Sequence, residues 1–261
     1  MYQAYWGFKQ SPFSPAAGRA VLDESPLHAE ALARLAFLVE HRSQLGLLVG
    51  PSGSGKSLVL GEFVRRQQAA GAAVALVLAG GLSARDALYD VAQQWGCLPS
   101  ETDDGRLWRL ATDRLAELHL EQVPAVLVVD DGDAPAADVV TIVQRLLAVP
   151  DVELTVVLAA HEQSAFRLGT RLLERAELRI ELALWNEDET RDYLKTTLER
   201  AGRQQPTFAD RAVARLFELS GGTPRRVNQL AQLALVAGAG QNLAQIDEQT
   251  VLAVHQELAA R

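Results

Sequence analysis

One loop of small residues, closed by a lysine and a serine, has the composition and spacing needed to hold phosphate groups. Its residues fit the pattern G-x-x-x-x-G-K-[ST], and they are Gly50, Pro51, Ser52, Gly53, Ser54, Gly55, Lys56 and Ser57. Glycines at these positions let the backbone turn so that successive N–H groups face phosphate oxygens. We expect Lys56 to bind the β- and γ-phosphates of ATP, and the Ser57 hydroxyl to bind Mg²⁺. The loop therefore predicts ATP and Mg²⁺ as cofactors.

Two aspartates, Asp130 and Asp131, follow a second apolar run. A phosphate loop needs a carboxylate at the end of another strand to hold the Mg²⁺ and its water, and we predict that role for Asp130. Asp131 stands where hydrolysing ring-forming ATPases usually have a glutamate that polarises the attacking water. Because aspartate is one methylene shorter, we expect slow hydrolysis. A paired aspartate also resembles the signalling ATPases of the STAND class, so hydrolysis stays compatible with the pattern.

Short apolar runs without alternation indicate strands that are covered on both faces. They lie at 45–50, 72–79, 124–131, 152–160 and 178–184. Segments with helical spacing separate them, at 56–69, 83–95, 105–120, 135–148 and 162–175. Because strands and helices alternate, we predict an α/β domain built on a parallel sheet.

From Trp185 onward the strand pattern stops and helical spacing continues. Asn186 followed by Glu189 predicts a capping box at a helix start. Helices are predicted at 187–201, 208–220, 224–238 and 247–259. We therefore predict three parts. A leader over 1–44 contains one amphipathic helix, a P-loop α/β domain covers 45–184, and a small all-helical lid domain covers 185–261.

The stretch "LSGGTPRR", residues 219–226, begins like the signature of ABC transporters. In ABC ATPases that signature precedes the strand with the metal-binding aspartate, whereas here it begins 89 positions after Asp130. The order excludes the ABC class. In ring-forming AAA+ ATPases an arginine at the start of the third lid helix contacts the γ-phosphate as sensor 2, and Arg225 occupies that position. We interpret Arg226 as an exposed neighbour.

Two further polar positions belong to the same kind of site. AAA+ proteins carry a polar sensor 1 residue at the end of the fourth strand, where this chain has His161, although a simple loop residue is the alternative. The arginines of 167–179 include candidates for a finger that enters a neighbour's site. We favour Arg175 as the catalytic finger, with Arg171 second, and the alternative is that these arginines only line a solvated helix.

With these motifs the chain resembles the ExeA (GspA-type) AAA+ ATPases of the bacterial general secretion pathway. The resemblance rests on "YWGFKQSPFSP", on the segment from His28 to the phosphate loop, on "RIELALWNEDETRDYLKTTLERAG" and on "GGTPRRVNQLAQLAL". It implies a sensor 2 role for Arg225 and carries Asn228 over as a family position. The chain departs from the family at "DDGD", where Asp-Glu-Ala-Gln is usual, and at "AAHEQS", where Gly-Gln-Pro-Glu-Leu is usual. Both lie beside the γ-phosphate, so the departures put efficient hydrolysis in doubt but not binding.

The composition restricts the functional classes. The net charge is −8, which argues against a generally basic nucleic-acid binder, and the single cysteine, Cys97, excludes an internal disulfide. No apolar run is long enough to span a bilayer, and the first residues lack the apolar core of a signal peptide. We therefore expect a cytoplasmic protein without a membrane span, which a partner recruits to the inner membrane.

Three functions remain open at this point. The favoured one is a motor or nucleotide switch that assembles a secretion or pilus-type complex, forms a homo-oligomer when ATP is bound, and works with a protein partner of that complex. The second is a transposition-type regulator that binds DNA in an ATP-dependent way, which the acidic balance and the three lysines disfavour. The third is a nucleotide-gated scaffold with little hydrolysis, which the "DDGD" departure motivates.

Overall fold

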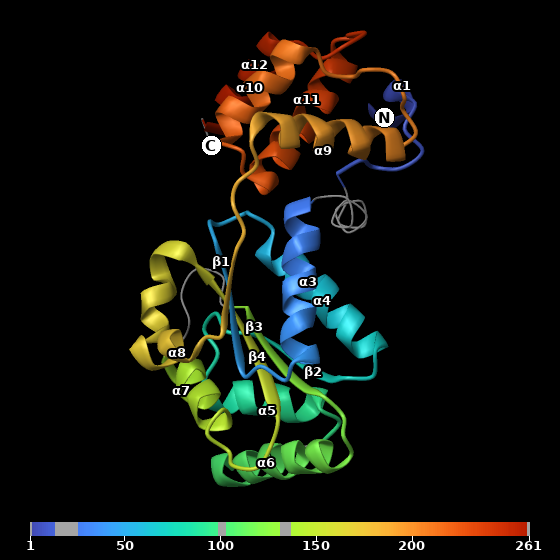
Figure 1. The fold of residues 1–261 in the computed structure, drawn as a ribbon. Coiled ribbons are helices and arrows are strands. Elements are labelled where there is room, and N and C mark those ends of the chain that lie inside the picture. The colour runs from blue at the N-terminus through green and yellow to red at the C-terminus, as the bar shows by residue number, and fades with distance from the viewer. Residues whose placement is uncertain (1, 14–25, 99–102, 131–136, 260–261) are drawn as a thin grey trace. The chain divides into compact units, whose positions relative to one another are not determined.

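A computed structural model describes residues 2–13, 26–98, 103–130 and 137–259 (Figure 1). The contacts within the chain divide it into two units, which we describe separately. The sheet unit comprises Leu27–Ser52 and Lys56–Leu182. The helical unit comprises Met1–Pro26, Gly53–Gly55 and Ala183–Arg261.

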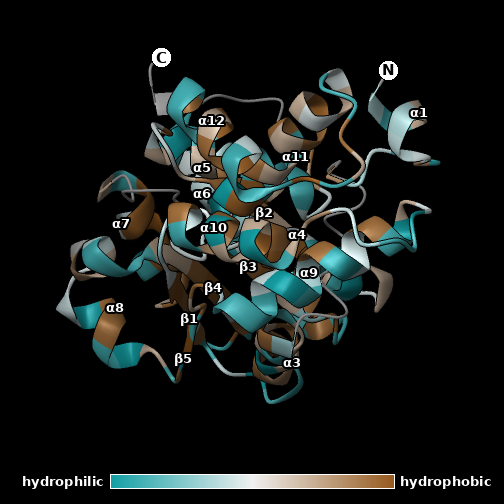
Figure 2. Cartoon of the chain, turned by 90° about the horizontal axis from the view of Figure 1, so that it is seen from above, coloured by the Kyte–Doolittle hydropathy of each residue, from teal (hydrophilic) through white to brown (hydrophobic). Residues whose placement is uncertain are grey.

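The sheet unit is built on five parallel strands in the order β2-β3-β4-β1-β5. Their bounds are β1 (Leu45–Gly50), β2 (Ala73–Leu78), β3 (Ala125–Asp130), β4 (Leu154–His161) and β5 (Leu178–Glu181). Every residue of β1 and β3 is buried, as the uninterrupted apolar runs predict, and these strands are mostly brown in Figure 2. The predicted α/β class with a parallel sheet is confirmed.

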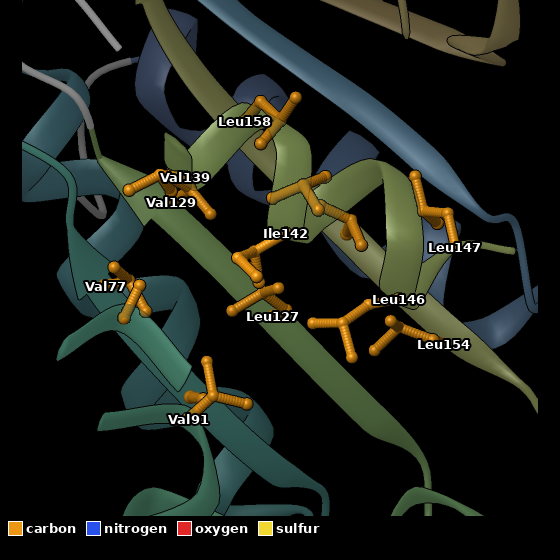
Figure 3. Packing of buried hydrophobic residues seen from close by; sticks show 14 of the residues in the cluster. Val77, Val91, Leu127, Val129, Val139, Ile142, Leu146, Leu147, Leu154 and Leu158 are labelled. Carbon is orange, nitrogen blue, oxygen red and sulfur yellow. The ribbon is translucent and has the colours of Figure 1, made fainter. Parts of the chain in front are cut away.

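Helices cover both faces of this sheet (Figure 1). They are α3 (Pro26–Glu40), α4 (Lys56–Ala69), α5 (Ala84–Gln94), α6 (Asp104–Leu120), α7 (Ala137–Leu146), the 3₁₀ segment η1 (Glu162–Leu168) and α8 (Thr170–Arg175). On one face, Ile142 and Leu146 of α7 pack over Leu127 and Val129 of β3 (Figure 3). This apolar layer holds the strands that lead into the candidate site.

The opposite face of the sheet is approached closely by α3. A Cβ built at Gly46 of β1 would lie 2.2 Å from Cδ1 of Leu38. Leu38 is 1% exposed and fills the space that a side chain at position 46 would need. The glycine of β1 therefore allows the helix before the strand to pack against it.

Two of the predicted elements were wrong in extent. The single helix predicted over 162–175 is interrupted, because Gly169 adopts φ +81° and separates η1 from α8. This conformation lies outside the helical region and is accessible to glycine at low cost. The last strand ends at Glu181 rather than at 184, so residues 182–185 lie outside the sheet strands.

Among its described residues, the helical unit contains four main helices and a short one near the start of the chain. They are α1 (Tyr2–Trp6), α9 (Glu187–Arg200), α10 (Asp210–Ser220), α11 (Pro224–Gly240) and α12 (Glu248–Ala259). The predicted capping box is present: Glu189 N–H donates to Asn186 Oδ1, and Asn186 N–H donates to Glu189 Oε2, both at 2.8 Å. Hence α9 begins where the sequence indicates.

The start of the chain is part of this helical core. Trp6 of α1 is 1% exposed, and its indole Nε1 donates a 2.8 Å hydrogen bond to the carbonyl of Leu235 in α11. Tyr5 donates through its hydroxyl to the carbonyl of Leu243 at 2.8 Å. The segment predicted as a leader is thus divided, with α1 in the helical unit and most of α3 in the sheet unit.

Within the described ranges, every helix is either too short or too polar to cross a membrane.

Candidate functional site

The predicted phosphate loop connects the end of β1 at Gly50 to the start of α4 at Lys56. Gly53 and Gly55 have φ angles of +80° and +105°, a region that side-chain-bearing residues rarely adopt. These two positions explain why the loop is rich in glycine, because the backbone must reverse there. Ser57, the predicted Mg²⁺ ligand, is exposed on the first turn of α4. The loop therefore has the strand-to-helix context that phosphate binding requires.

Lys56 is folded back across the loop. Its ammonium Nζ donates to the carbonyl of Gly50 at 2.7 Å and to that of Pro51 at 2.9 Å, and the residue is 7% exposed. Carbonyl oxygens carry only partial charge, so phosphate oxygens are stronger partners for the same ammonium. The lysine is consequently held at the loop in a position from which it can exchange backbone partners for a nucleotide's phosphates.

Asp130 ends β3 at the same edge of the sheet. In the register, β4 lies between β3 and β1, with Asp130 opposite Ala159 and His161 opposite Gly50. Asp130 is 8% exposed, and its Oδ1 has no hydrogen-bond partner among the residues that the structure describes. A buried carboxylate oxygen without a partner is costly, which points to a ligand such as a cation or its bound water. The donor fits the predicted Mg²⁺ role.

Asp131, predicted to face the attacking water, lies outside the described residues.

His161 ends β4 beside the start of the loop and also caps the following 3₁₀ segment. Its Nδ1 accepts a hydrogen bond from the Gln163 N–H at 3.1 Å. Nδ1 is therefore the unprotonated ring nitrogen, which leaves the hydrogen on Nε2. His161 is therefore compatible with both interpretations. Nδ1 caps the following segment, as a loop residue does, and Nε2 carries a hydrogen that a sensor residue can donate.

Arg225 lies on the first turn of α11, directly after Pro224. Gly221 ends α10 in the left-handed conformation, and Gly222 continues it with φ +69°. Arg225 is exposed, and its N–H donates to the carbonyl of Gly53, which belongs to the same helical unit, at 3.3 Å. The "GG" of the ABC-like stretch thus forms the turn that precedes the predicted sensor 2 residue.

Arg175, predicted as the finger, is bound to its own chain. Its Nε donates to Gln44 Oε1 and its Nη2 to the carbonyl of Leu147, both at 3.1 Å. Gln44 directly precedes β1, so these partners lie at the edge of the sheet opposite to the phosphate loop. Arg175 therefore lies away from Lys56 of its own chain. This position is compatible with a finger that acts on a neighbouring copy. Arg171, the second candidate, is exposed on α8.

Asn228 takes part in a buried polar contact that the sequence did not indicate. It accepts a hydrogen bond from the hydroxyl of Tyr193 in α9, and burial raises the pKa of that hydroxyl. The Tyr193 ring packs on Trp185 with centroids 4.4 Å apart. Sequence reasoning missed Tyr193 and Trp185, and the only signal was that aromatic residues stand on both sides of the Asn186 cap.

Comparison with known proteins gives results in agreement with this geometry. A family model described as an AAA domain matches residues 39–168. The chain is 29% identical over 246 residues to the general secretion pathway protein A of Aeromonas hydrophila, with 91% of this chain aligned. The alignment spans 45% of the length of that relative.

Solved structures with the same fold match this chain at less than 20% sequence identity. Cdc6p of Pyrobaculum aerophilum superposes with a TM-score of 0.74 at 16% identity, over 94% of this chain and 70% of that one. The Drosophila ORC bound to DNA gives 0.64 at 19% identity, over 97% and 67%. The Thermotoga maritima RuvB branch-migration motor gives 0.58 at 16% identity, over 88% and 69%.

Proposed function

We propose that the chain is an ExeA (GspA-type) AAA+ ATPase, which it resembles in sequence and in fold. In this proposal it binds ATP with Mg²⁺ and uses the nucleotide to drive or switch the assembly of a secretion or pilus-type complex. The observation that carries the proposal is the carboxyl edge of the sheet. There, the register brings together the strands that end at Gly50 and Asp130, and Lys56 donates to the Gly50 carbonyl. One buried carboxylate oxygen of Asp130 has no hydrogen-bond partner among the described residues.

Each residue at this edge has a role that its chemistry supports. The backbone N–H groups of 50–57 bind phosphate oxygens, and Lys56 supplies a point charge to the β- and γ-phosphates. Ser57 and Asp130 hold Mg²⁺, which neutralises charge on the phosphates when it is bound. Among the described residues no three His, Cys, Asp or Glu side chains gather to hold a metal by themselves. In this proposal phosphate oxygens complete the coordination of the metal, as is usual for Mg²⁺.

Hydrolysis, in this proposal, is slow. Asp131 polarises the attacking water. His161 contacts the γ-phosphate through Nε2–H as sensor 1, and Arg225 of the helical unit contacts it as sensor 2. Arg175 acts on a neighbouring copy, which makes the active form a homo-oligomer.

The secretion role is inferred from the relative. The Aeromonas relative is named as a protein of the general secretion pathway, and 45% of its length aligns with this chain. We propose that a protein of such a complex is the partner, and that this partner recruits the chain from the cytoplasm to the inner membrane.

Metal-dependent nucleotide binding tests the site directly. We would measure the affinity for ATP with Mg²⁺ and with EDTA, in the natural chain and in Asp130→Asn and Ser57→Ala. The affinity gain from Mg²⁺ should shrink at least about tenfold in both variants, which is about 1.4 kcal/mol. Asp138→Asn, at an exposed acid on the first turn of α7, is the matched control and should keep the full gain. An unchanged Mg²⁺ effect in Asp130→Asn contradicts the site.

The DNA-binding alternative predicts a different result. Retention of the chain on duplex DNA at low salt should then require ATP and should fall steeply as salt is added, because phosphate contacts release counterions. With a net charge of −8, we expect no such retention.

A further inference from the structure

Trp185 and Gly222 are in direct backbone contact. The Trp185 N–H donates to the carbonyl of Gly222 at 3.0 Å. A Cβ built at Gly222 would lie 2.0 Å from the Trp185 carbonyl oxygen, far inside contact distance. Because Gly222 also has φ +69°, neither its conformation nor its surroundings accept a side chain. The turn between α10 and α11 is thus packed directly on the backbone of Trp185.

Trp185 is itself fixed in the helical unit. The residue is 6% exposed, and its ring packs on Tyr193, whose hydroxyl donates to Asn228. Gly222 lies three residues before Arg225, and Asn228 lies three residues after it. The first turn of α11 is therefore held on both sides of Arg225 by contacts that lead to Trp185.

Trp185 also closely follows the end of the sheet along the chain. The Leu182 N–H donates at 2.8 Å to the carbonyl of Val49, which is the residue before Gly50 of the phosphate loop. Only Ala183 and Leu184 separate Leu182 from Trp185. An extended chain of this length spans no more than about 11 Å. Leu182, which is hydrogen-bonded to the strand before the phosphate loop, is thus joined to Trp185 through only two residues of chain.

We infer that Trp185 and Gly222 are positioning residues, which set the place of Arg225 and so determine how strongly the chain prefers ATP to ADP. The inference rests on the proposed function, in which Arg225 contacts the γ-phosphate. Trp185 and Gly222 touch no nucleotide in this account. They act only through the position of the α11 turn.

Two neighbouring glycines provide a matched test. Gly222→Ala adds a methyl group that collides with the Trp185 carbonyl, whereas Gly221→Ala adds one with no atom within 4 Å. Both positions have left-handed backbone, with φ +59° at Gly221, so both alanines carry a similar conformational cost. Any excess effect of Gly222→Ala beyond Gly221→Ala reports the contact with Trp185.

The readout is the ratio of the dissociation constants for ADP and ATP, measured with Mg²⁺, together with the thermal unfolding of each ligand-free variant. Arg225→Ala sets the scale, because it removes the γ-phosphate contact and leaves the phosphate loop. We expect Gly222→Ala to lower the ATP preference about as much as Arg225→Ala does, by roughly tenfold or about 1.4 kcal/mol. Gly221→Ala should keep the natural preference. The double variant Gly222→Ala/Arg225→Ala should show no further loss, since both changes remove one contact.

The outcomes separate the inference from the function on which it rests. If Arg225→Ala leaves the ATP preference unchanged, the sensor role of Arg225 in the proposed function is wrong. If Arg225→Ala lowers the preference but Gly222→Ala matches Gly221→Ala, the positioning role is overturned alone. Should Gly222→Ala fail to fold, Tyr193→Phe replaces it, because this change keeps the ring and removes the hydroxyl that donates to Asn228. A reduced ATP preference in Tyr193→Phe supports the inference, and an unchanged one overturns it.

Discussion

The ammonium of Lys56 donates a 2.7 Å hydrogen bond to the carbonyl of Gly50, the residue that ends the strand before the loop. The side chain thus returns to the start of its own loop, where phosphate oxygens would replace the carbonyl.

Lys56→Ala should abolish nucleotide binding without unfolding the chain. The loss of the point charge should weaken ATP binding by at least about 100-fold, or about 2.7 kcal/mol. The free energy of unfolding should fall by about 1–3 kcal/mol, because the lost contacts include two hydrogen bonds from the ammonium to backbone carbonyls. Calorimetric titration with ATP and thermal unfolding without ligand measure the two quantities. Lys195→Ala, at an exposed lysine of α9, is the control, and tight binding by Lys56→Ala would contradict the site.

Asp131→Glu should accelerate ATP turnover. Asp131 follows Asp130, the proposed Mg²⁺ ligand, and the added methylene should bring the carboxylate closer to the attacking water. We expect a gain of about tenfold, which corresponds to about 1.4 kcal/mol in the barrier. Steady-state phosphate release measures it, with Asp131→Asn as the inactive reference. If Asn matches the natural residue and Glu brings no gain, another residue holds the water or the chain is a scaffold without useful turnover.

ATP should convert the chain to an oligomer, and one arginine should act across the interface. Sedimentation with and without a slowly hydrolysed ATP analogue and Mg²⁺ measures the first expectation, and an unchanged monomer contradicts it.

For the arginine that acts across the interface, Arg175→Ala should lower turnover while ATP affinity stays the same. Arg171→Ala is the matched comparison, because Arg171 is the exposed alternative on the same helix. Loss of turnover in Arg171→Ala alone would transfer the finger role to that residue and assign Arg175 to its contacts with Gln44 and Leu147.

Trp6→Ala should destabilise the helical unit although it lies at the start of the chain. The indole is 1% exposed and bonded to the Leu235 carbonyl, so truncation should cost about 3–5 kcal/mol of the free energy of unfolding. Tyr5→Phe removes only the hydroxyl bond to Leu243 from a side chain that is 41% exposed, and should cost about 0.5–1 kcal/mol. Denaturant unfolding followed by circular dichroism compares the two. Equal effects would show that the buried indole is not what holds α1.

Glu62 should make stability depend on pH at the acid end. Hydrogen bonds from Arg65, and then from Arg66, lower the pKa of this carboxyl from 4.5 to about 2. Because the folded pKa is the lower one, the contribution is complete above pH 4.5 and is lost as the pH falls toward 2. We expect about 1 kcal/mol in total, since Arg65 and Arg66 are 63% and 45% exposed and screened by water. The unfolding free energy of the natural chain should exceed that of Glu62→Gln at pH 7, and most of the difference should be gone by pH 3. A difference that does not change with pH would contradict the ion-pair account.

The sequence alone identified features that depend on neighbours along the chain. The phosphate loop, the strand runs and the Asn186–Glu189 capping box are local, because their function requires only a few consecutive residues in one backbone conformation. For the same reason, the parallel sheet could be predicted from uninterrupted apolar runs separated by helical spacing. Local patterns also misled where one residue decides the backbone, as at Gly169, whose φ of +81° ends a helix that periodicity alone would continue.

Only the tertiary structure decided which distant residues meet. The strand order places Asp130 and His161 at the edge where the loop begins, and no spacing in the sequence reports that order. It also shows that Trp6 belongs to the helical core 229 residues away along the chain, and that Gly222 is a glycine because the Trp185 carbonyl occupies the place of its side chain. Such contacts arise from packing between elements, where burial and hydrogen bonding reward proximity in space regardless of separation in sequence, so periodicity and motif carry no record of them.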